Sequence, residues 1–133
     1  MNKYAIWFRW VVWFGIIGNW TFSIAVFVNA NNVLEFLHLG PVESTIWLFN
    51  YSVLLALLSC FYIPAAHNPF RYRVNCWLLI ACRLIPAMTF FIGVALSYMP
   101  RGFLRLGFGD GAVGIIELVL LTLLLRKGET KTE

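Results

Sequence analysis

Four apolar runs, each long enough to cross a lipid bilayer, constrain this chain more than any other feature of its sequence. They cover about residues 7–30, 45–65, 75–98 and 110–126. A transmembrane helix needs about 20 apolar residues to span roughly 30 Å of hydrocarbon. Inside the bilayer, a helix satisfies all of its own backbone hydrogen bonds. The sequence therefore predicts an all-α integral membrane protein, with four transmembrane helices in one domain of residues 1–133.

The composition excludes a soluble domain. Hydrophobic residues make up 61% of the 133 residues and charged residues 12%, whereas soluble domains average about 45–50% and about 25%. The formal charge of +4 comes from basic residues near the ends of the apolar runs, where they indicate membrane orientation. We expect lipids and other integral membrane subunits as partners, and no nucleic acid.

The basic residues outside the apolar runs also predict the topology. One side of an antiparallel up-down bundle would carry most of the Lys and Arg residues: Lys3, Arg9, Arg71, Arg73, Arg126, Lys127 and Lys131. The other side would carry Arg101 and Arg105 alone. Because cytoplasmic loops are enriched in Lys and Arg, both termini should be cytoplasmic. We expect a multi-pass protein of the bacterial inner membrane, with a short, charged, disordered tail at 127–133.

Arg83 is the most unusual residue of the third run. It lies about 12 Å from the cytoplasmic boundary at about 1.5 Å per residue, where an unpaired Arg costs from about 2.5 to more than 10 kcal/mol. Glu117 of the fourth run lies about 13 Å from the same boundary. We therefore predict a buried ion pair between Arg83 and Glu117, first as a structural clamp and alternatively as part of a proton or substrate pathway. Pro86 should kink the same helix, because it cannot donate to the carbonyl of Cys82.

Small or weakly polar residues recur at helical spacing in three of the runs. Such residues let membrane helices approach closely and form hydrogen bonds between helices. We predict that these stripes face the interior of the bundle and leave Phe, Leu, Ile and Trp side chains outside. The stripes are Gly15, Asn19 and Ser23; Ser52, Ala56 and Cys60; and Asp110, Gly114 and Glu117.

Other candidate sites are few. Glu35, His38 and Glu43 share the connection between the first two runs and could approach copper or zinc. Their spacing fits no recognised metal site, so we predict no metal. No nucleophile–base pair or pair of catalytic carboxylates is visible, so we do not expect an enzyme.

These observations favour a non-catalytic accessory or structural subunit of a larger membrane protein complex. We expect the host to be a respiratory or other membrane oxidoreductase complex engaged in electron transport. Two alternatives remain open: a small oligomeric transporter or channel that uses Arg83 and Glu117, and a quinone- or haem-associated membrane anchor. We predict no cofactor besides bound lipid, but the third hypothesis would place a quinone ring among aromatic residues near Arg83.

Overall fold

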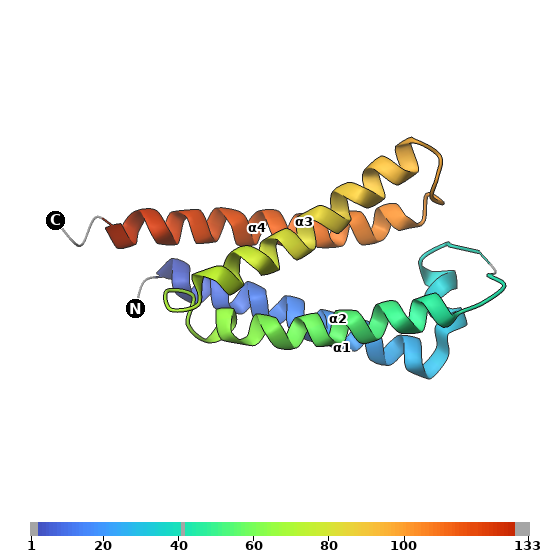
Figure 1. The fold of residues 1–133 in the computed structure, drawn as a ribbon, viewed down its shortest axis with the longest axis horizontal. Coiled ribbons are helices and arrows are strands. Elements are labelled where there is room, and N and C mark those ends of the chain that lie inside the picture. The colour runs from blue at the N-terminus through green and yellow to red at the C-terminus, as the bar shows by residue number, and fades with distance from the viewer. Residues whose placement is uncertain (1–2, 41, 130–133) are drawn as a thin grey trace.

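The computed structural model describes residues 3–40 and 42–129, and the predicted all-α architecture is confirmed there. The four helices are α1 (Lys3–Phe36), α2 (Ile46–His67), α3 (Arg73–Ala95) and α4 (Phe103–Glu129) (Figure 1). Each of them contains a segment long and apolar enough to cross a membrane. These four candidate spans indicate a multi-pass membrane protein.

Helix α1 is longer than its predicted span of residues 7–30, but it is interrupted close to the predicted end. Asn29 has extended backbone angles, with φ −158° and ψ 92°. Its side-chain oxygen accepts a hydrogen bond from the backbone N–H of Asn32 at 3.2 Å. Asn29 thus caps the last segment of α1, as Asn commonly does at the start of a helix.

Helix α4 begins at Phe103 rather than at residue 110, which corrects the predicted boundary. The sequence from 103 to 111 is rich in glycine and resembles a loop. Two of its three glycines instead face α3: a Cβ on Gly107 would lie 3.4 Å from Phe90, and one on Gly111 would lie 3.5 Å from Ala87. Glycine is tolerated in membrane helices because it allows such close approach. The extension places Asp110 well inside α4.

Three smaller differences concern the other boundaries. Helix α2 covers 46–67 where 45–65 was predicted, and α3 covers 73–95 where 75–98 was predicted. Helix α4 continues to Glu129, so the first residues of the predicted disordered tail are helical. The rest of that tail, 130–133, lies outside the described residues.

The helices associate mainly as two pairs. Helix α1 packs most extensively on α2, and α3 on α4; the pairs meet mainly through α1 and α4 and less extensively through α2 and α3. Figure 1 shows both chain termini at one end of the molecule, with α3 diverging from α2 toward the opposite end. We call the half that holds the termini the terminal half and the other the distal half.

The two halves differ in their packing. The largest buried cluster includes residues from all four helices: Ala5, Phe8, Val12, Ile16, Tyr62, Ala65, Ala66, Cys76, Leu79, Ile80, Leu121 and Leu124. A second cluster gathers Val26, Val33, Leu34, Leu37 and Leu48, which come from α1, the turn after it and α2. The terminal half is therefore closed by a four-helix core, whereas the buried cluster of the distal half comes from α1, the turn after it and α2.

The turns that end α1 and α3 share a backbone feature. Leu39 N–H donates to the carbonyl of Leu34, and His38 N–H to that of Glu35. The same pattern joins Tyr98 to Gly93 and Ser97 to Val94. Each is a Schellman motif, whose left-handed position is usually glycine. Here that position holds His38, with φ 55°, and Ser97, with φ 61°.

We predict that His38→Gly stabilises the protein. A side chain in the left-handed region costs roughly 1–2 kcal/mol, which the substitution removes. The greater conformational freedom of glycine in the unfolded chain offsets part of this stabilisation. The net increase in the free energy of unfolding should be about 0.5–1 kcal/mol. Denaturation in detergent micelles would measure it, with His38→Ala as the control because it keeps the strained backbone. Equal stability of the two variants would contradict this account.

Candidate functional site

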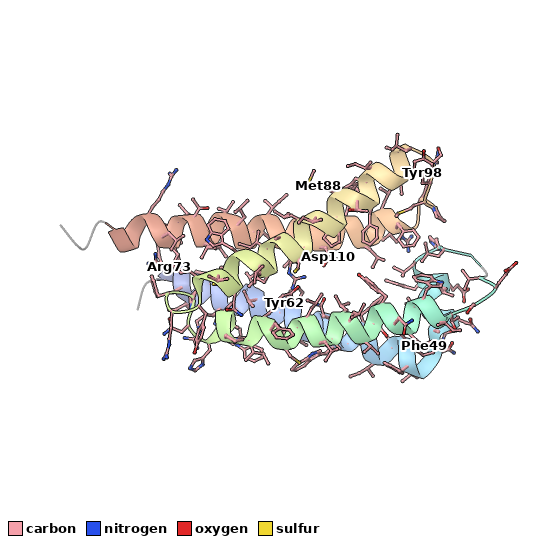
Figure 2. All side chains as sticks on the ribbon, in the orientation of Figure 1. Phe49, Tyr62, Arg73, Met88, Tyr98 and Asp110 are labelled. Atoms are coloured by element: carbon pink, nitrogen blue, oxygen red, sulfur yellow. The ribbon has the colours of Figure 1, made fainter. Side chains whose placement is uncertain are left out.

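Arg83 lies in the middle of α3 and is buried among the other helices, with a side chain only 4% exposed. It is ten residues from Arg73, where α3 begins, which places it about 15 Å along the helix, near the centre of a bilayer of about 30 Å. In Figure 2, Asp110 and Tyr62 lie near the middle of the long axis, while Arg73 and Tyr98 lie at the two ends of α3. The site is thus set at mid-depth in the bundle.

Two carboxylates of α4 contact this guanidinium. Arg83 Nε lies 3.1 Å from Glu117 Oε2, so the structure brings together the two residues that the sequence paired. Arg83 Nη1 donates a hydrogen bond of 3.1 Å to Asp110 Oδ1. Asp110 and Glu117 are seven residues apart, and a helix turns about twice over that distance. One α3 side chain therefore bridges two turns of α4.

The sequence analysis missed the contact between Arg83 and Asp110. Asp110 was predicted to be on the stripe with Glu117. Because the fourth span was predicted to begin at residue 110, Asp110 stood at its outer end and not at the depth of Arg83. The signal that could have found it was the spacing of Asp110, Gly114 and Glu117 by four and three residues, which puts all three on one helix face.

Two glycines make room for the guanidinium and its helix. A Cβ on Gly15 of α1 would lie 2.0 Å from Arg83 Nη2, and one on Gly114 of α4 would lie 3.1 Å from Arg83 Cβ. Tyr62 of α2 supplies another wall, with its ring centroid 5.8 Å from Arg83 Cζ. This distance allows a cation–π interaction. Arg83 is therefore held by residues from the three other helices.

The charged cluster is incompletely hydrogen-bonded. Within the described residues, Arg83 Nε and Nη2 and both oxygens of Glu117 are buried and have no hydrogen-bond partner, although Glu117 forms its ion pair. Glu117 is fully buried, whereas the side chain of Asp110 is 21% exposed. The two carboxylates thus have different surroundings: one is enclosed, and the other reaches open space.

Uncharged polar residues join α1 to α2 beside this cluster. Asn19 Nδ2 donates to Ser59 Oγ at 2.8 Å, and Ser23 Oγ lies 2.8 Å from the carbonyl of Ser52, to which it donates. Trp20 Nε1 donates to the carbonyl of Ala56 at 3.3 Å. The bond between Ser23 and Ser52 joins the first two predicted stripes, whereas the other two bonds involve Ser59 and Trp20, which belong to neither stripe.

Cys60 is a correction to the second stripe, because it is exposed. Its thiol donates to the carbonyl of Ala56 in its own helix, and Ser59 occupies the position facing α1. Each step of four residues turns about 40° beyond a full circle, since a helix has about 3.6 residues per turn. After two such steps Cys60 has rotated off the interface, whereas steps of four and then three, through Ala56 to Ser59, stay on it.

Two cavities meet at Arg83 and Asp110. The α1–α4 cavity, of about 230 Å³, also includes Gly15, Gly18 and Arg105 in its lining. The α2–α3 cavity, of about 200 Å³, is also lined by Leu58, Tyr62, Cys82 and Pro86. Both are lined by Asn19, Tyr51, Leu55, Arg83 and Asp110. The cation and the half-open carboxylate therefore face space on two sides, while Glu117 lines neither cavity.

A larger cavity, of about 620 Å³, follows the distal half of α1. We call it the distal groove. Its lining includes Asn29 and Asn32, and it shares Phe22, Arg105 and Leu106 with the α1–α4 cavity. Arg105 Nη1 donates to the carbonyl of Phe36, which ties the start of α4 to the end of α1. The distal groove and the α1–α4 cavity are therefore neighbours along α1, and the α1–α4 cavity extends to Arg83.

Of the remaining predicted residues, the three metal candidates lie apart from this site, whereas Pro86 lines one of its cavities. Within 3–40 and 42–129, no three His, Cys, Asp or Glu residues are placed to hold a metal ion, so Glu35, His38 and Glu43 are not brought together. Helix α3 is continuous through Pro86, whose ring lines the α2–α3 cavity. Among the described residues, Asn29 of α1 has non-helical backbone angles inside a helix; the kink at Pro86 stays a prediction.

Gly15→Ala should destabilise the protein, while Gly18→Ala should not. The new methyl group at Gly15 would push Arg83 Nη2 away, and the two ion pairs prevent an easy shift of the guanidinium. A Cβ on Gly18 would meet nothing within 4 Å, which makes it a matched control on the same helix. Overpacking of this kind costs about 1–3 kcal/mol. Denaturation in micelles would measure the free energy of unfolding of both variants. If the two substitutions lower it equally, Arg83 does not lie close to Gly15.

Arg83→Leu should be the most harmful single substitution at the site, because it leaves two carboxylates without their cation. Breaking a buried pair from one side costs about 3–5 kcal/mol. Adding Glu117→Leu should recover part of this loss, since it removes the carboxylate that is fully buried. The yield of folded protein and its stability in micelles would show this. A double variant no better than Arg83→Leu alone would argue against the pairing.

Comparisons of this chain with protein-family models, with curated proteins and with solved structures found no match. A functional proposal for this protein therefore rests on the geometry of the charged site.

Proposed function

We propose that this protein binds a small ligand inside the bilayer, at the Arg83–Asp110 pair. The proposed topology is an antiparallel up-down bundle in the bacterial inner membrane with both termini cytoplasmic. The excess of Lys and Arg in the segments on that side supports this orientation. The position of both chain ends at one end of the molecule is consistent with it (Figure 1).

The meeting of two cavities at Arg83 and Asp110 carries this proposal. A purely structural ion pair would be enclosed by packed side chains, as Glu117 is. Asp110 instead reaches two cavities that also expose Asn19 and Tyr51. Ionisable residues within membrane spans that face a cavity commonly mark ligand or ion sites, and convergent polar groups in an apolar pocket are typical of small-molecule sites.

The two carboxylates have separate roles in this proposal. Glu117 neutralises Arg83 from the packed side and holds α3 against α4. Asp110 binds the other edge of the guanidinium and keeps it oriented toward the cavities. A ligand in either cavity would find a donor in Arg83, an acceptor in Asp110 and both kinds of group in the amide of Asn19.

Transport is a second candidate function, and the two neighbouring cavities along α1 favour it. These two cavities run from Asn29 and Asn32, near the distal end, through the residues around Arg105 to Arg83. The four-helix core of the terminal half closes the path beyond Arg83. A transporter open to one side of the membrane would have this arrangement.

The accessory-subunit hypothesis stays a prediction. The exposed face of α1 carries Trp7, Trp10, Phe14 and Ile17 at alternating steps of three and four residues. A partner helix could pack along such a stripe, but lipid covers an apolar stripe equally well. This face therefore does not distinguish a subunit of a complex from an independent membrane protein.

We predict that a lipid-soluble maleimide labels Cys82 at least ten times faster than Cys76 in native membranes. Cys82 lines the α2–α3 cavity, whereas Cys76 belongs to the four-helix core and is fully buried, so its reaction requires local unfolding. Variants that each retain one cysteine would give the two rates by mass spectrometry. A variant retaining only Cys60, which is exposed outside the cavities, serves as the reference for a reactive thiol in lipid.

A polar, membrane-impermeant thiol reagent separates the two candidate functions. Labelling of Cys82 by this reagent would indicate a water-filled path and favour transport. Labelling by the lipid-soluble reagent alone would indicate a binding site reached from the bilayer. If Cys82 reacts as slowly as Cys76 with both reagents, no accessible cavity reaches Arg83, and the proposed function is wrong.

A further inference from the structure

The charges that line the α2–α3 cavity cancel. Arg83 and Asp110 are its charged lining residues, and they are paired with each other at 3.1 Å. Glu117 also contacts Arg83 from outside this cavity, so an anion that entered would lose its hydration without meeting positive charge in excess, which is costly in the bilayer. A neutral ligand avoids this cost and can still form hydrogen bonds with the pair.

The walls of this cavity include lipid-facing residues. Leu54 and Leu58 of α2 line it, and they are 60% and 38% exposed on the outer surface of the bundle. The cavity that they line lies between α2 and α3, which pack on each other less extensively than the other pairs of helices in contact. A ligand that passes between these helices therefore comes from the hydrocarbon of the bilayer, so it should be lipid-soluble.

The shape and the donors of the cavity favour a flat ring that carries oxygen acceptors. Its volume of about 200 Å³ is smaller than the roughly 300–1,000 Å³ of ordinary ligand pockets, which suits a headgroup whose tail remains in lipid. Tyr51, Tyr62 and Pro86 provide flat walls. Arg83 and Tyr51 line the cavity, and their side chains carry N–H and O–H groups that can donate to a ring carbonyl.

We infer that the α2–α3 cavity binds the headgroup of a quinone, with the isoprenoid tail leaving between α2 and α3 past Leu58. A quinone is neutral, flat and lipid-soluble, and its two carbonyl oxygens accept hydrogen bonds. Arg83 and Tyr51 are the donors available to one carbonyl. This inference rests on the proposed function and specifies its ligand; it concerns binding and involves no redox step.

Photolabelling with an azido-substituted quinone tests the inference on the full chain in lipid nanodiscs. We expect label on peptides that contain 51–62 or 82–86, and an excess of a fully substituted decyl-benzoquinone should prevent it. Leu58→Trp, which fills the cavity from its lipid side, should reduce this competable labelling about tenfold. Leu57→Trp is the matched control, because Leu57 is 54% exposed but does not line the cavity.

Competable labelling that depends on Leu58 and not on Leu57 supports the inference, provided both variants elute as the parent protein does on gel filtration. Labelling that decyl-benzoquinone does not prevent, or that both substitutions reduce equally, overturns it. Competable labelling by a photoreactive sterol in place of the quinone also overturns it. In these cases reactive Cys82 would still support a ligand site of another kind, whereas unreactive Cys82 would remove the proposed function itself.

Discussion

The structure depends on one guanidinium that bridges two turns of a neighbouring helix inside a hydrocarbon environment. Arg83 reaches Glu117 with Nε and Asp110 with Nη1, so its charge is neutralised at both edges. Coulombic attraction at about 3 Å is far stronger in a medium of low dielectric than in water. Because α3 and α4 are linked by these contacts, they form one unit, and Gly15 lets that unit approach α1 closely enough to complete the bundle.

The packing on either side of this bridge is unequal, and the inequality creates the site. Toward the termini, side chains from four helices fill the interior, and most of them are fully buried. Toward the distal end, α3 leaves α2 and the polar residues Asn19 and Tyr51 border open space. A charge cluster enclosed on both sides would serve only as a clamp. Its position at the boundary between a dense half and a looser half makes it accessible to a ligand.

Much of this architecture could be predicted from hydropathy and depth along the chain. The four spans follow from apolar length, and the contact between Arg83 and Glu117 follows from their equal distance to one boundary. The start of α4 could not be predicted, because glycine ends helices in water but allows close helix packing in a membrane. That error displaced Asp110 from the site. Cys60 was misplaced for a different reason, since a strict spacing of four drifts around the helix, while Ser59 follows the actual interface.

The presence of two carboxylates is itself an argument that the site does more than hold helices together. One carboxylate is enough to neutralise a guanidinium, and Glu117 meets that need from a fully buried position. Asp110 adds a second desolvated charge, whose transfer from water costs several kcal/mol before pairing. The helix pair α3–α4 also packs through Gly107, Gly111 and Gly114 without its help. The cost of Asp110 is therefore best explained by the cavities that it faces, where its carboxylate orients Arg83 for a third group.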